Sequence, residues 1–172
     1  EIYGHALGIY GQMLYYGIGA KVNKEEAVIY LKKAADMQHF DSMYLYARCL
    51  RHGMGVPINK EAAVHYYNMA ANYGNTTAML NLGHMYYKGD EIPPNKGIAA
   101  QYYKMAAQQL STNGMINYGK MLLIGEGIPS NKQEGINYIK LAADLGNEQA
   151  MLIYSEIISI EKNIPYNEEE SL

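Results

Sequence analysis

The sequence has one cysteine, one phenylalanine and no tryptophan among its 172 residues. Because Cys49 has no second cysteine to pair with, an intrachain disulfide is excluded and stability must come from packing. No apolar run approaches the length of a transmembrane helix, and the N-terminal residues lack the basic and apolar segments of a signal peptide. These absences favour a cytoplasmic protein without fixing its compartment.

An excess of one charge is also lacking. Lys and Arg number 14, Asp and Glu number 17, and the net charge is −3. A chain this close to neutrality has no bulk electrostatic attraction for nucleic acid or for an anionic membrane. Its apolar fraction of 49% is ample for a packed core. We therefore expect a folded protein that neither binds nucleic acid nor inserts directly into a membrane.

The patterns of common catalytic and cofactor sites are missing as well. The sequence has no H-E-x-x-H, no G-x-S-x-G and no Walker-type loop, and no histidine stands at zinc-ligand spacing from another ligand. We predict no catalytic residue, no cofactor and no metal ion. Cys49 occupies a helix packing position, which favours a buried structural thiol over a nucleophile. A catalytic domain elsewhere in a longer parent chain is left open.

What the sequence does contain is a period of 36 residues. Glycines keep this interval at Gly17, Gly53, Gly89 and Gly125, and Ala-Ala pairs keep it at Ala34-Ala35, Ala70-Ala71, Ala106-Ala107 and Ala142-Ala143. Self-similarity at a fixed period of about 20–50 residues is typical of stacked repeats. The period therefore predicts a repeat protein rather than a globule with one closed core.

Each period contains two helical patterns. In the first, helix A, recurring apolar and small residues are spaced to fall on one face of a helix. In the second, helix B, the recurring positions have offsets of zero, three, seven and eight, as in Ala63, Tyr66, Ala70 and Ala71. We predict helix pairs over residues 5–36, 41–72, 77–108 and 113–145. A ninth helix over 149–160 and an acidic tail over 161–172 follow, all within one repeat domain over 1–172.

The turns carry their own signals. Glycine follows helix A because it accepts a positive φ, and asparagine precedes helix B as an N-cap. Glu26 and Glu134 stand three residues after two of these asparagines, as in a capping box. Gln38 and Leu110 replace the glycine found in the other links between repeats, so we predict less regular links there.

The repeated pattern resembles a known family. The order A-x-x-x-L-G-x-x-Y-x-x-G resembles the first helix of the Sel-1-like repeat, and it is seen at Ala78, Leu82, Gly83, Tyr86 and Gly89. The order N-x-x-x-A-x-x-Y-Y-x-x-A-A-x-x-G-N over residues 59–75 resembles the second helix. The related tetratricopeptide repeat has a period of about 34 residues, which fits less well.

The resemblance implies an all-α fold, a right-handed α/α superhelical solenoid whose A helices line a concave surface. It also implies an adaptor that assembles signalling, membrane-quality-control or cell-wall-synthesis complexes. One cysteine-rich bacterial branch, with β-lactam binding or hydrolysis, staples each helix pair with a disulfide, which Cys49 alone cannot do. The chain departs from the family pattern at Lys21, Glu91 and Glu161.

If helix A lines a groove, its positions that vary between repeats face outward. The partner-binding residues predicted in this way are Gln12, Tyr15, Tyr44, Arg48, Arg51, Leu80, His84, Tyr87, Ile116, Lys120 and Leu123. Tyrosine and arginine are favoured at binding hot spots. Arg48 and Arg51 predict a partner with an acidic group, and the competing interpretation is an ordinary solvated helix face.

We therefore predict a non-catalytic scaffold or adaptor that binds a partner peptide or protein through the A helices. Two alternatives stay open. One is a β-lactam-binding, hydrolase-like repeat protein of the cell envelope, and the other is a regulatory repeat region fused to an enzyme. The sequence leaves the partner's identity and the oligomeric state undetermined.

Overall fold

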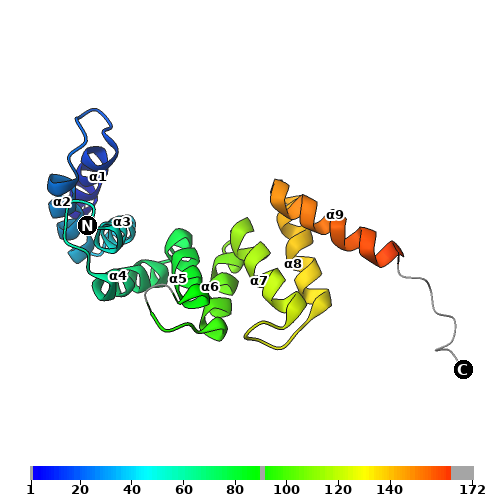
Figure 1. Ribbon diagram of the computed structural model, residues 1–172. Coiled ribbons are helices and arrows are strands. Elements are labelled where there is room, and N and C mark those ends of the chain that lie inside the picture. Colours follow the sequence, from blue (N-terminus) through cyan, green and yellow to red (C-terminus); the bar gives the residue numbers. More distant parts are fainter. Residues whose placement is uncertain (1, 90–91, 164–172) are drawn as a thin grey trace, which may run out of the picture. The chain divides into compact units, whose positions relative to one another are not determined.

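The computed structural model describes residues 2–89 and 92–163, the last three of them by backbone alone. Every regular element in these residues is an α-helix, which confirms the all-α repeat fold (Figure 1). The A helices are α1 (Ile2–Tyr16), α3 (Phe40–His52), α5 (Thr76–Lys88), α7 (Thr112–Ile124) and α9 (Glu148–Asn163). The B helices are α2 (Lys24–Asp36), α4 (Lys60–Asn72), α6 (Lys96–Gln108) and α8 (Lys132–Asp144).

The end of α9 shortens the predicted tail. Because α9 runs to Asn163, the first three residues of the stretch predicted as tail have helical backbone. The rest of that stretch, and the departure from the family pattern at Glu91, lie outside the described residues.

The chain divides into two compact units, Glu1–Pro94 and Asn95–Leu172. In unit 1, each of α1 to α4 packs against the next helix, and α1 also contacts α3 directly. In unit 2, α6 packs on α7, α7 on α8 and α8 on α9. Packing between sequence neighbours is the arrangement of a repeat stack. The assignment of residues 1–172 to a single domain stays a prediction.

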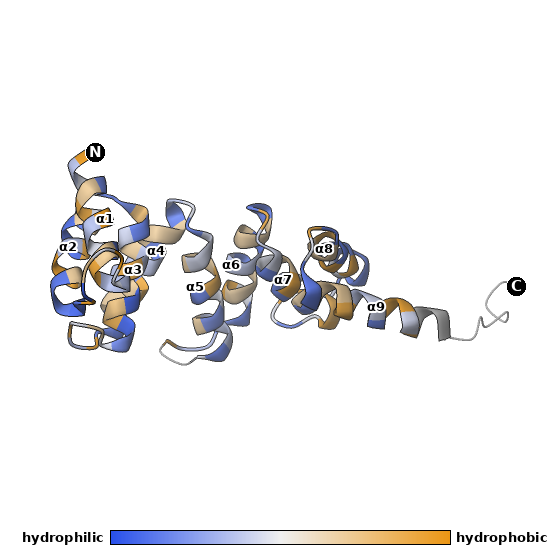
Figure 2. Cartoon of the chain, turned by 90° about the horizontal axis from the view of Figure 1, so that it is seen from above, coloured by the Kyte–Doolittle hydropathy of each residue, from blue (hydrophilic) through white to orange (hydrophobic). Residues whose placement is uncertain are grey.

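Hydrophobic and hydrophilic residues are mixed around each helix (Figure 2). Within the described ranges, no helix combines the length and the apolar character that crossing a bilayer would require.

Asparagine side chains begin the B helices as predicted. The side-chain oxygens of Asn23, Asn59, Asn95 and Asn131 accept the backbone N–H three residues later at 3.1, 2.9, 3.0 and 3.2 Å. Both predicted capping glutamates also engage, because Asn23 Nδ2 donates to the Glu26 carboxylate at 3.0 Å and Asn131 Nδ2 to that of Glu134 at 2.9 Å. Each B helix therefore has a side chain that satisfies one of its free N–H groups.

Three of the A helices also begin at a side-chain cap, which the sequence pattern did not predict. Asn75, Ser111 and Asn147 accept the N–H three residues later at 2.8, 3.3 and 3.0 Å. Helices α5, α7 and α9 therefore start at Thr76, Thr112 and Glu148, about one residue before the expected positions.

The links between repeats are more uniform than predicted. Gln38 and Leu110 adopt φ of 65° and 61°, the left-handed backbone found at Gly74 and Gly146. In all four links, the residue that follows this left-handed position donates its backbone N–H to the carbonyl oxygen of the first alanine in the preceding Ala-Ala pair. These hydrogen bonds are between 2.9 and 3.1 Å long. The predicted irregularity at Gln38 and Leu110 is therefore wrong. The shared hydrogen bonds impose the same turn even where the residue is not glycine.

The second glycine of the A–B turn lies against the preceding repeat. A Cβ on Gly55 would lie 2.2 Å from the carbonyl oxygen of Lys24, and one on Gly127 would lie 2.5 Å from the Cβ of Lys96. Gly19 has a similar φ, but a Cβ there would meet only the Met13 side chain, at 3.5 Å. At Gly55 and Gly127, glycine is therefore required by the contact between repeats as well as by the turn.

Helix B buries the predicted small residues at offsets zero, seven and eight, such as Ala63, Ala70 and Ala71, but does not fully bury the tyrosine at offset three. The fully packed large residue stands four positions after the first small residue instead, and these residues are Leu31, Tyr67, Tyr103 and Ile139, all 3% exposed or less. Tyr66 and Tyr102 are half-buried. Tyr67 and Tyr103 therefore pack in the core, whereas Tyr66 and Tyr102 lie at its margin.

Tyrosines of helix A and helix B form pairs within a repeat. Edge-to-face ring contacts join Tyr10 to Tyr30, Tyr46 to Tyr66 and Tyr118 to Tyr138, with centroids 4.8, 4.8 and 5.1 Å apart. This geometry is favourable because the positive edge of one ring meets the negative face of the other. Each pair joins helix A to helix B of the same repeat.

Cys49 is fully buried in α3, and burial raises the pKa of its thiol to about 11. The predicted structural thiol is confirmed. Methionines recur at one position of helix A and form a stripe that is buried at Met43, Met79 and Met115 but 47% exposed at Met151. The stripe therefore belongs to the core only as far as α7.

Candidate functional site

The predicted partner-binding residues are divided between the two units. Unit 1 contains Gln12, Tyr15, Tyr44, Arg48, Arg51, Leu80, His84 and Tyr87, and unit 2 contains Ile116, Lys120 and Leu123. His84 and Lys120 are exposed, and Gln12, Leu80, Tyr87 and Leu123 are half-buried. The contacts described below lie within unit 1, apart from the packing of Ile116.

Two of the predicted residues do not face solvent. Tyr15 is 5% exposed, and its hydroxyl donates to the Met54 sulfur at 3.4 Å. Ile116 is 2% exposed and packs in a core cluster with Ala142 and Ala150. The expectation that these positions face outward is wrong, because helix A is also covered by the neighbouring repeat.

Arg48 lies among tyrosines. Its guanidinium carbon is 5.8 Å from the ring centroid of Tyr15, within the range of a cation–π contact. Burial lowers the pKa of Arg48, but Tyr15, Tyr44 and Tyr16 act in the opposite direction and leave it raised. Arg48 is therefore a permanently charged, half-buried cation with aromatic walls.

Arg51 lies one turn further along α3 and connects that helix to α5. Its Nη1 donates to Asn81 Oδ1 at 3.4 Å, at the long end of hydrogen-bond distances. The residue is half-buried. A spacing of three residues places Arg48 and Arg51 on the same side of the helix.

Tyr67 reaches the same place from α4. It is 0% exposed, and its ring centroid lies 6.0 Å from that of Tyr44. Burial raises the pKa of the Tyr67 hydroxyl, and the charges of Arg51 and Arg48 partly oppose that rise. No signal in the sequence places the Tyr67 hydroxyl next to the two arginines. We call Tyr15, Tyr44, Arg48, Arg51 and Tyr67 the arginine cluster.

Acidic residues are scarce on the A helices of unit 1. Across α1, α3 and α5 the sequence has one, Asp41, against Arg48, Arg51 and Lys88. Asp41 lies in the first turn of α3, at the opposite end from the arginines, and its carboxylate accepts a hydrogen bond from Asn75 Nδ2 at 3.2 Å. These three helices therefore present an excess of positive charge, although the whole chain is acidic.

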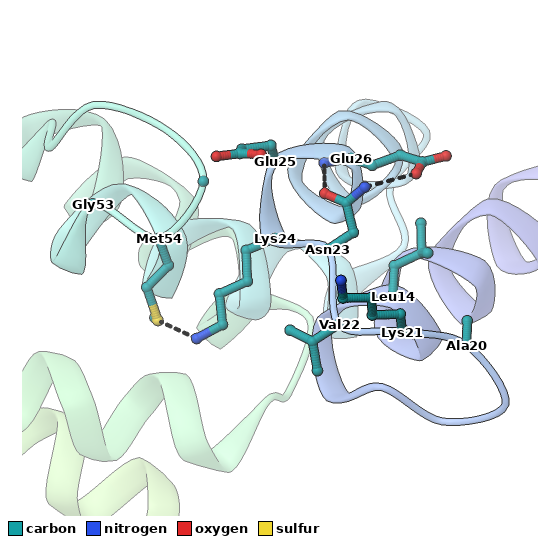
Figure 3. A pocket seen from close by; sticks show the side chains of 11 residues that line it. Leu14, Ala20, Lys21, Val22, Asn23, Lys24, Glu25, Glu26, Gly53 and Met54 are labelled. Atoms are coloured by element: carbon teal, nitrogen blue, oxygen red, sulfur yellow. Dashed lines mark hydrogen bonds between the residues drawn. The ribbon is translucent and has the colours of Figure 1, made fainter.

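An open cleft of about 910 Å³ lies between the first A–B turn, the start of α2 and the turn after α3 (Figure 3). In it, Lys24 Nζ approaches the Met54 sulfur at 3.7 Å, and Glu25 and Glu26 line the same space. The sequence analysis did not predict this cleft. Its lining mixes charges of both signs and does not select a ligand of one charge.

Histidine side chains meet at the start of unit 1. His5 Nδ1 lies 3.1 Å from His39 Nε2, and His39 Nδ1 lies 2.8 Å from Ser42 Oγ. Burial lowers the pKa of His39, the nearby His5 acts in the same direction, and Asp41 opposes both. Among the described residues, no group of three or more His, Cys, Asp or Glu side chains is arranged to hold a metal ion.

Comparison with protein families identifies the repeat. The Sel1 repeat model matches residues 5–39, 40–75, 76–109 and 112–147. The chain belongs to the Sel1 repeat family. Sel1 repeats generally act as modules for protein–protein interaction. No curated protein matches the chain.

Solved structures share the Sel1 fold. A protective antigen of uropathogenic Escherichia coli with an SLR fold is 26% identical to this chain, with a TM-score of 0.88. The match covers 93% of this chain and 34% of the antigen. A Sel1 repeat protein of Oxalobacter formigenes is 28% identical, with a TM-score of 0.80. The match covers 86% of this chain and 60% of that protein. Cysteine-rich protein B of Helicobacter pylori is 24% identical, with a TM-score of 0.58. The match covers 72% of this chain and 93% of that protein, and it shows similarity of fold alone. The chain thus spans about a third of the first protein and three fifths of the second.

Proposed function

We propose that this Sel1 repeat chain is a non-catalytic scaffold whose unit 1 binds an acidic segment of a partner protein at Arg48 and Arg51. The arginine cluster is the observation that supports this. It combines two guanidinium groups on one side of α3 with the ring of Tyr15 and with the hydroxyl of Tyr44, which acts on the pKa of Arg48. Arginine and tyrosine together provide the area and the directed hydrogen bonds that interface hot spots use.

Partial burial makes such a site stronger than a fully solvated one. At an effective dielectric constant of about 20, two opposite unit charges about 4 Å apart attract by about 4 kcal/mol, against about 1 kcal/mol in bulk water. Arg48 and Arg51 are both half-buried. A carboxylate that reaches them is held by charge and by a bidentate hydrogen bond, which lysine does not offer.

The burial of Cys49 supports the non-catalytic part of this proposal. A nucleophilic cysteine needs a thiolate in an accessible, electropositive environment. Cys49 is 0% exposed and its pKa is raised to about 11, so the thiol stays protonated at neutral pH. A role as acyl acceptor is therefore not supported for this residue.

The proposal is tested by selecting peptides on the immobilised chain from a random display library of short peptides. We expect the selected peptides to be enriched in Asp and Glu and to lose at least about tenfold in affinity for the Arg48→Glu/Arg51→Glu double variant, because two attractive contacts become repulsive. Lys21→Glu/Lys132→Glu is the matched control, since it changes the net charge equally at two exposed sites.

Two results would contradict the proposal. One is a set of selected peptides without acidic enrichment. The other is an equal loss of affinity in both double variants, which would mean that net charge alone, rather than the arginine cluster, attracts the peptides.

A further inference from the structure

Within the arginine cluster, the Tyr67 hydroxyl is a buried polar group that lacks a hydrogen-bond acceptor in the described part of the chain. The side chain is 0% exposed, and its hydroxyl has no hydrogen-bond partner of ordinary geometry among the described residues. Arg51 is close enough to act on the pKa of this hydroxyl as a hydrogen-bond donor, so the group that is missing is an acceptor for the hydroxyl proton. A buried hydroxyl without a partner destabilises the folded state, and such groups are uncommon in folded proteins. This one lies beside the surface that we propose binds an acidic partner.

The neighbours of this hydroxyl show which kind of group is missing. A tyrosine hydroxyl can both donate and accept, whereas a guanidinium only donates. Arg51 and Arg48 are the cations whose charges act on Tyr67, and Tyr44 is the third polar neighbour. The cations can supply hydrogen atoms to the hydroxyl oxygen but cannot accept its proton. The missing partner is therefore an acceptor, and next to two positive charges an anionic acceptor is favoured.

We infer that Tyr67 is a binding residue of the acidic-peptide site and that its hydroxyl donates a hydrogen bond to the carboxylate held by Arg48 and Arg51. This inference rests on the proposed function. The bound carboxylate would then have two guanidinium groups from α3 and one hydroxyl from α4, so its oxygens meet three donors. A carboxylate accepts that number readily.

Arg51 can open the way to this hydroxyl. Its hydrogen bond to Asn81 is 3.4 Å long, so it is weaker than a charge-assisted bond of about 2.7–2.9 Å to a carboxylate. An incoming carboxylate therefore competes with Asn81 for the guanidinium of Arg51. The inference requires that this exchange exposes the Tyr67 hydroxyl, which is buried in the free chain.

The test uses a capped alanine hexapeptide with two central glutamates, its glutamine counterpart, and the intact chain at constant ionic strength. Binding is measured by NMR titration of backbone amides. We expect wild type to bind the glutamate peptide more tightly than the glutamine peptide. Tyr67→Phe, which removes only the hydroxyl, should weaken binding of the glutamate peptide by about five- to tenfold.

A second measurement separates binding from packing. Because the hydroxyl proton has no acceptor among the described residues, Tyr67→Phe should raise the Tm of the unliganded chain by about 2–4 °C. Tyr66→Phe is the matched control on the same helix, since the Tyr66 hydroxyl donates to Asp36 at 3.1 Å. That variant should lower Tm slightly and leave peptide binding unchanged.

The outcomes distinguish the inference from the proposed function. If Arg48→Glu/Arg51→Glu abolishes binding while Tyr67→Phe binds like wild type, the inference fails and the proposed function stands. If wild type does not prefer the glutamate peptide, the acidic specificity itself fails. A lower Tm in Tyr67→Phe would also overturn the inference, because it would show that the hydroxyl already donates its proton to an acceptor, such as water, in the free protein.

Discussion

The backbone carbonyl of Lys24 lies where a side chain on Gly55 would have to be, because a Cβ there would come within 2.2 Å of that oxygen. Real Cβ contacts essentially never come below 3.0 Å. The contact joins the turn after α3 to the start of α2, so one residue without a side chain sets the spacing of two repeats.

Substitution of Gly55 should therefore be more harmful than turn geometry alone explains. Gly55→Ala should destabilise unit 1 by more than about 3 kcal/mol, because backbone strain at positive φ adds to a clash with backbone. Gly19→Ala is the control, with φ of 70° against 72° at Gly55 but no close contact, and it should cost about 1 kcal/mol. Urea denaturation measures both values. Equal losses would show that the contact between repeats is unimportant.

Met54 offers a place to add an ion pair between repeats. In unit 2, Lys96 at the start of α6 forms an ion pair with Glu126 in the following turn. One of the two corresponding lysines in unit 1, Lys24, meets the Met54 sulfur at 3.7 Å instead. Met54→Glu should stabilise unit 1 by about 0.2–1 kcal/mol at low salt, and the gain should shrink at high salt. Thermal unfolding at two salt concentrations tests this, with Met54→Gln as the uncharged control. A gain shared by both variants would contradict the electrostatic explanation.

Leu110 carries strain that glycine would relieve. It is a leucine at φ of 61°, and its side chain is 67% exposed, so little packing is lost on removing it. Leu110→Gly should stabilise the chain by up to about 1 kcal/mol, since release of left-handed strain exceeds the added entropy of the unfolded chain.

Gly146→Leu is the reciprocal variant of this experiment. Gly146 has φ of 87°, and a Cβ added there would have nothing within 4 Å, so the substitution adds strain without a steric clash. We expect it to destabilise the chain by about 1–2 kcal/mol. The two variants should thus shift the denaturation midpoint in opposite directions, and shifts of the same sign would rule out backbone strain as the cause.

Stability should depend on pH through His39. Burial lowers its pKa in the folded state, with His5 adding to the effect and Asp41 opposing it. The unfolded chain, where histidine has a pKa of about 6.5, therefore binds the proton more readily. The contribution of neutral His39 is fully present above about pH 6.5 and is lost as the pH falls through the lower, folded-state pKa.

The measurement is the free energy of unfolding between about pH 8 and pH 5 for wild type, His39→Asn and the control His52→Asn. The wild type and the control should lose stability on acidification, and His39→Asn should have a flatter profile. An unchanged slope in His39→Asn would show that other groups cause the acid dependence.

The period, the helix type and the turn chemistry could be predicted because each depends on local sequence. Asn23 caps α2 and Gly53 ends α3 with φ of 68° through backbone geometry that a few residues determine. The exposure of individual positions could not be predicted in the same way. Positions three and four after Ala63 lie on one helical face, and only the neighbouring helices decide that Tyr67 rather than Tyr66 is fully buried.

The candidate site was predictable only in part, for the same physical reason. Arg48 and Arg51 share one helix, so their spacing in the sequence is enough to place them together. Tyr67 comes from α4, and its position next to them depends on packing between helices. Tyr15 was expected at the surface, but its burial depends on a turn from the next repeat that contributes Met54.

Three repeats contain an edge-to-face tyrosine pair that can serve as a site for a fluorescence probe: Tyr10–Tyr30, Tyr46–Tyr66 and Tyr118–Tyr138. With 18 tyrosines and no tryptophan, its native fluorescence comes from tyrosine alone. A single tryptophan placed in one pair would accept energy from nearby tyrosines and would emit at its own wavelength. Such variants, made one pair at a time, would show whether the repeats melt together or one after another.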